Sequence, residues 1–165
     1  MKNLPYSFLF FGTSFLLLVW VSETFATSKS ETRQRFHTLL ERSNKMQKIE
    51  QLVEFDDAND GIKIVRRIRH RLVEMMVYIQ TVKVASLDLD TITVHEGGLT
   101  VPSITIQCKG EKKQANYLTQ LVSIDENGVE EAEQTSQKYK NKIVIECHPL
   151  VAHQLADALK QSLAK

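Results

Sequence analysis

The sequence predicts an α+β domain: an N-terminal antiparallel helical hairpin, a four-stranded antiparallel β-meander and a C-terminal helix, preceded by a signal peptide. Three observations lead to this fold class. Apolar residues recur at spacings of three and four over two N-terminal segments, alternate with polar residues beyond residue 80, and return to helical spacing near the C-terminus. The 165 residues contain no internal repeat, so one domain is expected over 27–165. The hairpin would occupy 27–85, the sheet 86–147 and the last helix 148–165.

Residues 1–26 are predicted to be the signal peptide. Lys2 precedes an apolar run over 8–21, and Thr24, Phe25 and Ala26 follow with small residues where signal peptidase needs them. This run of 14 residues is shorter than the ~20 residues that span a bilayer. We therefore expect cleavage after Ala26 and a secreted or periplasmic mature chain without a stable membrane span. The alternative is an uncleaved segment that anchors the protein in a membrane.

The segment 61–78 defines the predicted hairpin, because it combines regular helical spacing with the densest positive charge. Its apolar stripe, continued to residue 82, consists of Ile62, Val65, Ile68, Leu72, Met75, Ile79 and Val82. Apolar residues between 30 and 54 follow the same spacing, without Gly or Pro to interrupt it. The connector at 56–61, DDANDG, is short and rich in turn-forming residues. Two helices joined by it would be antiparallel neighbours.

A turn centred near Ala58 also predicts which residues of the hairpin face each other. The expected pairs are Phe36 with Val82, Leu39 with Ile79, Ile49 with Ile68, Leu52 with Val65, Glu54 with Lys63, Glu50 with Arg67 and Arg42 with Glu74. Each pair joins two apolar residues or two opposite charges. Because an exposed ion pair contributes only ~0.2–1 kcal/mol, this agreement bears on the register more than on stability.

Four strands are expected at 87–95, 101–108, 117–125 and 139–147, where polar and apolar residues alternate. The connectors after the first three strands carry Gly, as tight turns require, which favours a meander. Residues 129–137 are acidic and lack an apolar pattern, so a solvated loop is expected there. Pro149 at a first-turn position, followed by apolar residues at helical spacing, predicts the closing helix.

Cys108 and Cys147 are the only cysteines, and in an exported chain they are the candidates for a disulfide. In a plain meander, the second and fourth strands would be separated by another strand, beyond bonding distance. The bond therefore requires these strands to be adjacent or their ends to bend together. The alternative is two separate small hydrophobic residues at strand ends.

Cys147 could also act in catalysis with His148 and His153 as thiolate and base, or bind a metal together with His95. The spacing matches no specific signature, and we expect His148 to cap the last helix and His153 to lie on its surface. The sequence also lacks a phosphate-binding glycine loop, a G-x-S-x-G elbow and a zinc-type cysteine quartet. No catalytic residue, metal ligand or cofactor is therefore predicted.

Charge gives a local signal only, since removing Lys2 and Glu23 with the leader leaves the net charge at +1. Nucleic acid is not an expected partner of an exported chain with this balance. Arg66, Arg69 and Arg71 have no full partner in the predicted hairpin. They are the candidate contacts for an acidic protein surface or an anionic ligand, and the alternative is a solvated helix face.

These patterns favour an exported, non-enzymatic binding or assembly module that uses the basic helical hairpin as its contact surface. The alternative is a small-ligand carrier with a pocket between the sheet and the helices. A weaker alternative is an enzyme built on the cysteine and histidine residues named above.

Overall fold

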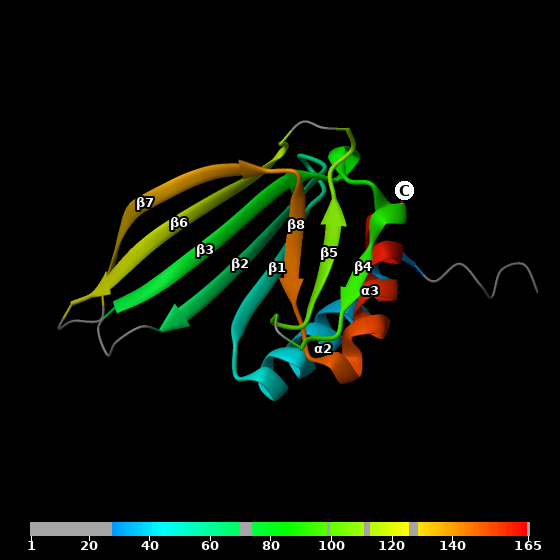
Figure 1. Ribbon diagram of the computed structural model, residues 1–165, viewed down its shortest axis with the longest axis horizontal. Coiled ribbons are helices and arrows are strands. Elements are labelled where there is room, and N and C mark those ends of the chain that lie inside the picture. Colours follow the sequence, from blue (N-terminus) through cyan, green and yellow to red (C-terminus); the bar gives the residue numbers. More distant parts are fainter. Residues whose placement is uncertain (1–27, 70–73, 99, 111–112, 126–128, 165) are drawn as a thin grey trace, which may run out of the picture.

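The computed structural model describes residues 28–69, 74–98, 100–110, 113–125 and 129–164 (Figure 1). These residues form two α-helices, eight strands and two 3-10 turns. In chain order the elements are α2 (Lys29–Gln47), β1 (Glu50–Asp56), β2 (Gly61–Arg69), β3 (Glu74–Lys83), η1 (Val84–Ser86), η2 (Leu89–Thr91), β4 (Thr93–His95), β5 (Ser103–Gln107), β6 (Ala115–Ile124), β7 (Glu130–Lys140), β8 (Lys142–Glu146) and α3 (Pro149–Leu163).

The strands form two antiparallel sheets. The large sheet has the order β1-β2-β3-β6-β7, and the small sheet has the order β4-β5-β8. Figure 1 shows the small sheet and both helices gathered near β1, while β3, β6 and β7 extend away from them. The predicted single meander is wrong, because β6 and β7 belong to one sheet and β4, β5 and β8 to the other.

The predicted helical hairpin is also wrong, since 27–85 contains one described helix followed by three strands. The spacing of three and four in 61–69 arises because apolar residues occupy both faces of β2. Ile62 and Ile64 enter the main core, whereas Val65 packs against a second apolar cluster. Alternate residues of a strand point to opposite faces, and β-branched side chains favour strands. That enrichment was the signal for strand over helix.

The chain reversal at 56–61 is where predicted, and part of the predicted register is confirmed in the β1–β2 hairpin. Leu52 lies opposite Val65. Glu54 lies opposite Lys63, and Glu50 lies opposite Arg67. A short connection fixes which residues face each other whether strands or helices flank it. The pairs that involved residues 36, 39 and 42 required a second helix, but their predicted partners lie in β3.

Among the later elements, β5 lies within the strand predicted at 101–108, and β6 overlaps the strand predicted at 117–125. β7, by contrast, occupies much of the loop predicted at 129–137. β7 is an edge strand whose residues are nearly all exposed, so it needs no apolar alternation. The predicted strand at 87–95 contains η2 and the short strand β4. A single residue, Asn141, separates β7 from β8, and there the chain passes from the large sheet to the small one.

Local capping sets the boundaries of both helices. The Ser28 hydroxyl accepts from the Glu31 N–H, and the Glu31 carboxylate accepts from the Ser28 N–H, which forms a capping box at the start of α2. At α3, His148 Nδ1 accepts from the Leu150 N–H and Pro149 occupies the first turn, as predicted. No helix of the described residues is long and apolar enough to cross a membrane.

The main core lies between the near end of the large sheet, the small sheet and the two helices, which pack against each other. Its largest fully buried side chains are Phe36, Val53, Ile62, Ile64, Leu87, Ile104, Ile106, Ile143, Ile145, Leu155 and Leu159. The rest of the large sheet therefore projects beyond the core.

Two glutamines of the large sheet attach it to β8. The Gln51 side-chain amide donates to the Glu146 carbonyl oxygen (3.0 Å) and accepts from the Glu146 N–H (3.2 Å). Gln80 forms the same pair of bonds with Val144, each 2.9 Å. Both side chains are buried, and each takes the place of a neighbouring strand along the outer edge of β8. We call this arrangement the glutamine clasp.

Candidate functional site

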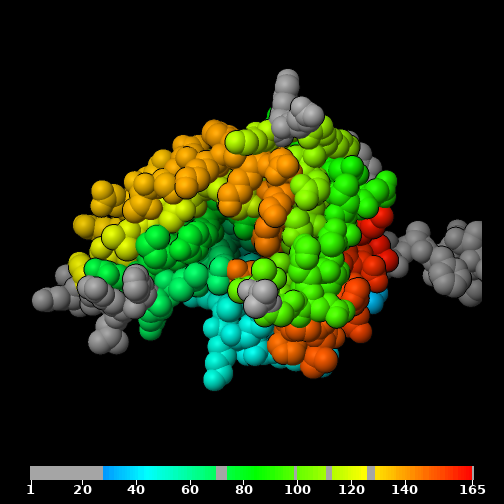
Figure 2. Space-filling view, in the orientation of Figure 1, coloured from blue at the N-terminus to red at the C-terminus, as the bar shows by residue number. Residues whose placement is uncertain are grey.

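A groove runs across the large sheet on the face turned away from β8. Its volume is about 560 Å³, within the range of sites that hold small ligands. It is lined by Glu50, Gln51, Leu52, Glu54, Lys63, Val65, Arg67, Val77, Ile79, Gln120, Val122, Glu130 and Ala132. The lining thus draws on all five strands, mostly at alternate positions that point away from the main core. Figure 2 shows the opposite side of the molecule, which carries β8 and is hollowed between β8 and the far strands.

The floor of this groove is apolar. Val77 and Val122 are 7% and 4% exposed and pack together with Met75, and Val65 and Ile79 lie against them. Neither α2 nor α3 contributes to the lining or to this cluster. The floor is therefore a second, small apolar cluster separate from the main core, and a bound apolar group would extend it.

The rim of the groove is charged, but its two cations have partners. Lys63 Nζ lies 3.1 Å from Glu54 Oε2, and Arg67 Nη1 lies 3.6 Å from Glu50 Oε1. All four side chains are 43% exposed or more, so the pairs are solvated. With Glu130 also on the rim, the entrance has no excess of positive charge that would select an anion.

A second hollow adjoins the groove along the same face. Its volume is about 520 Å³, and it shares Glu54 and Lys63 with the groove. Polar side chains contribute much of its wall, including Asn59, Gln114 and Asn116. The face thus offers an apolar floor at one end and hydrogen-bonding amides at the other.

Of the three arginines predicted to bind a partner, the two that the structure describes lie on opposite faces of the large sheet. Arg66 points to the other side of the sheet, where its Nη1 lies 2.5 Å from Glu146 Oε1. Arg69 is exposed at the end of β2. Arg71 lies outside the described residues. Because successive strand residues alternate between faces, Arg66 and Arg69 cannot share the one helix face assumed for them.

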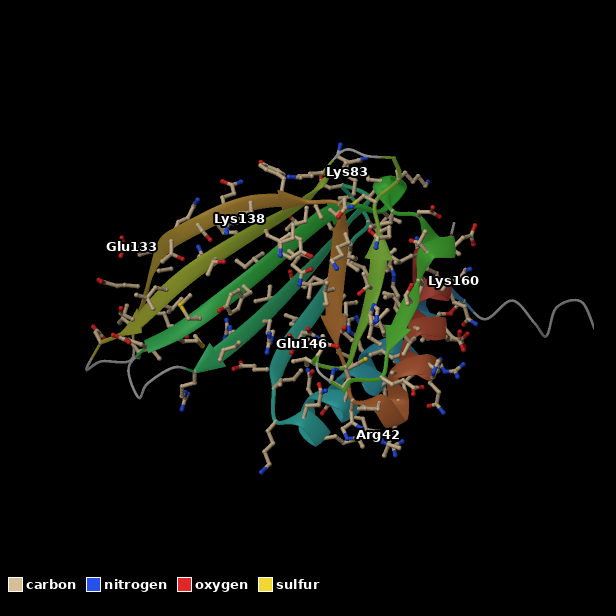
Figure 3. The ribbon with its side chains drawn as sticks, in the orientation of Figure 1. Arg42, Lys83, Glu133, Lys138, Glu146 and Lys160 are labelled. Atoms are coloured by element: carbon tan, nitrogen blue, oxygen red, sulfur yellow. The ribbon has the colours of Figure 1, made fainter. Side chains whose placement is uncertain are left out.

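The Arg66–Glu146 ion pair joins the two sheets next to the glutamine clasp. Figure 3 shows Glu146 at the lower end of β8, beside β1. The two side chains are 27% and 14% exposed. Burial raises the pKa of Glu146 above its ordinary value, although the Arg66 guanidinium acts in the opposite direction. Arg66 Nε and Glu146 Oε2 are buried and have no hydrogen-bond partner among the described residues. Because each side chain keeps one buried polar atom without a partner, this ion pair stabilises the structure less than its short distance suggests.

Both cysteines lie in the described part of the chain as free, buried thiols, so the predicted disulfide is not present. β5 and β8 are adjacent, as the bond required, but their antiparallel register places the cysteines at opposite ends. The Cys108 N–H donates to the Asn141 carbonyl at one end, and the Cys147 N–H donates to the Pro102 carbonyl at the other. Six residues of extended chain separate these ends, about 20 Å, far beyond the reach of a disulfide.

The cysteine and histidine residues do not assemble into the suggested catalytic group. Burial, and to a lesser extent the Glu146 carboxylate, raises the pKa of Cys147 to about 11, so the thiol stays protonated at neutral pH. His148 caps α3, as expected. His153 is on the surface, with Nε2 3.0 Å from Glu96 Oε1. No group of three or more His, Cys, Asp or Glu side chains that could hold a metal occurs in the described ranges.

The helical spacing in 61–82 hid the groove, because on a helix Val65, Ile79 and Met75 would share one stripe with Ile62 and Val82. In the structure the first three belong to the groove face and the other two to the core face. The available signal was the density of β-branched residues on both faces of 61–82, which is typical of strands.

Comparisons of the chain with protein-family models, with curated proteins and with solved structures found no match. The class of protein is thus defined by its own fold: a two-sheet α+β protein with an open groove on the face of its larger sheet that neither described helix covers.

Proposed function

We propose that this protein is an exported, non-enzymatic binding protein that holds a small, largely apolar ligand in the groove of the large sheet. The observation that carries this proposal is the apolar floor formed by Val65, Val77, Ile79 and Val122 on a sheet face that neither helix covers. Small-ligand sites are concave and mostly apolar, with a few polar groups that orient the ligand. The amides of Asn59, Gln114 and Asn116 in the adjoining hollow each use one atom in a hydrogen bond within the protein, and their other amide atoms are suited to that orienting role.

The groove favours an apolar or weakly polar ligand over the anionic partner expected from the arginines. Lys63 and Arg67 are its cations, and Glu54 and Glu50 already pair with them. An anion would have to displace these carboxylates and approach Glu130, which opposes binding. Burial of apolar surface at the floor supplies the driving force instead, at roughly 25 cal/mol per Å².

Filling the groove from its rim tests the proposal. Ala132 is exposed on β7 and lines the groove, so Ala132→Trp should occupy the cavity without disturbing the core. The probe is the neutral fluorophore 1-N-phenylnaphthylamine, followed by its emission on titration. Ala132→Trp should weaken binding about tenfold or more, which corresponds to ~1.4 kcal/mol, while Ala132→Ser should leave it unchanged.

Glu133→Trp is the matched control, because Glu133 is the next residue of β7 and is also exposed, but is not part of the groove lining. Equal loss of binding in Ala132→Trp and Glu133→Trp would mean that the probe binds elsewhere. Unchanged binding in Ala132→Trp would overturn the proposed site.

Export is the second part of the proposal, and the residues that carry it, 1–26, lie outside the described residues. The capping box of α2 begins at Ser28, so cleavage after Ala26 would leave this helix start intact. We expect N-terminal sequencing of the protein recovered from an exporting host to begin at Thr27. Recovery of the chain in the membrane with 1–26 still attached would support the anchored alternative instead.

A further inference from the structure

Among the strands that the structure describes, β7 is an open edge of the large sheet. It is the last strand of the order, with β6 as its partner, and its 11 residues are all exposed except Ser136, which is partly buried. Figure 1 shows β7 along the outer side of the sheet with no helix or other strand beyond it. Backbone N–H and C=O groups on such an edge are available to pair with an added strand.

The charges along β7 are segregated by sign. Three of its first four residues are acidic (Glu130, Glu131 and Glu133), and two of its last three are basic (Lys138 and Lys140). Figure 3 shows Glu133 and Lys138 in the two halves of the strand. Lys140 Nζ lies 4.2 Å from the centre of the Tyr117 ring. Within the described residues, none of these five charges forms an ion pair.

This order of charges has a specific consequence for self-pairing. When two identical strands pair in antiparallel fashion, the first half of each lies opposite the second half of the other. In the register that places Glu133 opposite Lys138, Glu131 stands opposite Lys140. Parallel self-pairing would instead set acid against acid and base against base, which is unfavourable.

We propose that two copies of this chain associate through antiparallel pairing of their β7 edges, so that the two large sheets become one continuous sheet. The occupant of the edge is a second copy because β7 is complementary in charge to itself. A strand whose charges served only to keep an edge solvated would not need them sorted by sign.

The irregularity of β7 is compatible with this pairing. Its register against β6 shifts between Thr119 and Gln120, and Thr135 is the residue of β7 without a pairing partner there. The Thr135 hydroxyl donates to the Thr119 carbonyl oxygen (3.1 Å), which directs this side chain toward β6. The shift falls at the middle of β7, so the bulges of two copies would meet near the two-fold axis. The regular acidic and basic segments on either side would form the ladders.

Two charge-reversed variants of the purified chain test the proposal. The basic-edge variant carries Glu131→Lys and Glu133→Lys, and the acidic-edge variant carries Lys138→Glu and Lys140→Glu. Sedimentation velocity should show a dimer of the unaltered protein whose dissociation constant rises at least about tenfold between low and high salt, because salt screens exposed charges. Each variant alone should be monomeric. An equimolar mixture in which one variant is labelled with nitrogen-15 should form the heterodimer, which native mass spectrometry identifies by a mass midway between those of the two homodimers.

Several outcomes would overturn the proposal. The unaltered protein could be monomeric at every accessible concentration, or both variants could remain dimeric, or their mixture could stay monomeric while both variants are folded by circular dichroism. If a double variant does not fold, amide exchange of the unaltered protein decides the matter. Protection along 130–140 should rise with protein concentration, and an unchanged pattern would refute the β7 interface. Ligand binding in the groove can succeed or fail independently of these results.

Discussion

Replacing Gln80 by Met tests the glutamine clasp. Met has nearly the same length as Gln but can neither donate nor accept the two 2.9 Å bonds with Val144. Gln80 is 9% exposed, so little water can reach the Val144 N–H and carbonyl groups once they lose their partner. An unsatisfied buried polar group costs about 1–3 kcal/mol, and burial of the Met side chain returns part of this loss. We expect Gln80→Met to lower the free energy of unfolding by about 2–4 kcal/mol.

Chemical denaturation measures this loss, and amide exchange locates it. The Val144 N–H is held by Gln80 rather than by a strand, so its exchange should accelerate strongly in Gln80→Met. The N–H groups of Ile143 and Ile145 lie at the alternate positions, which face β5. They should exchange almost as slowly in Gln80→Met as in the unaltered protein.

Gln120→Met is the matched control, because Gln120 lies in the same sheet but lines the groove and is only partly buried. Its substitution should change stability by less than about 0.5 kcal/mol. Equal stability of the two Met variants, or unaltered exchange at Val144 in Gln80→Met, would show that the clasp does not hold β8 to the large sheet.

Three further predictions follow from the charged and sulfur-containing groups. Burial raises the pKa of Glu146, so its contribution to stability is full below the unfolded-state pKa and is lost as pH rises through the folded-state value. Glu146→Gln should therefore gain stability relative to the unaltered protein as pH rises above 4.5, the ordinary pKa of Glu, and a pH-independent difference in denaturation midpoint would contradict this. Arg33 makes two hydrogen bonds to Asp57, of 2.5 and 2.7 Å, and lies over the Phe55 ring. In the same denaturation assay, Arg33→Ala should lower the free energy of unfolding by about 1 kcal/mol, and Arg33→Lys should have an intermediate effect. Because Cys108 and Cys147 are free and buried, reductant should not shift the melting temperature, and a thiol reagent should titrate both only after unfolding. If the chain, denatured without reductant, shows no reactive thiols, the two cysteines are not free as the structure has them.

The sequence by itself determined the features that depend on neighbouring residues. Pro149 and the His148 cap specify the start of α3, and apolar spacing specifies its buried face. The turn-forming residues of 56–61 fix the chain reversal, and with it the pairing of Leu52 with Val65 and of Glu54 with Lys63. These signals act over a few residues, so they can be read without knowing what the rest of the chain does.

Only the tertiary structure decided how the elements assemble. Gln51 and Gln80 reach β8 across 95 and 64 residues of sequence, and no local pattern distinguishes them from solvated glutamines. The division of the strands into two sheets, and hence the separation of Cys108 from Cys147, depends on which edges pair. The apolar residues of β2 and β3 fit both a helical stripe and two sheet faces. Strand pairing resolves this ambiguity, because it satisfies the backbone of both strands and leaves one face to the core and the other to the groove.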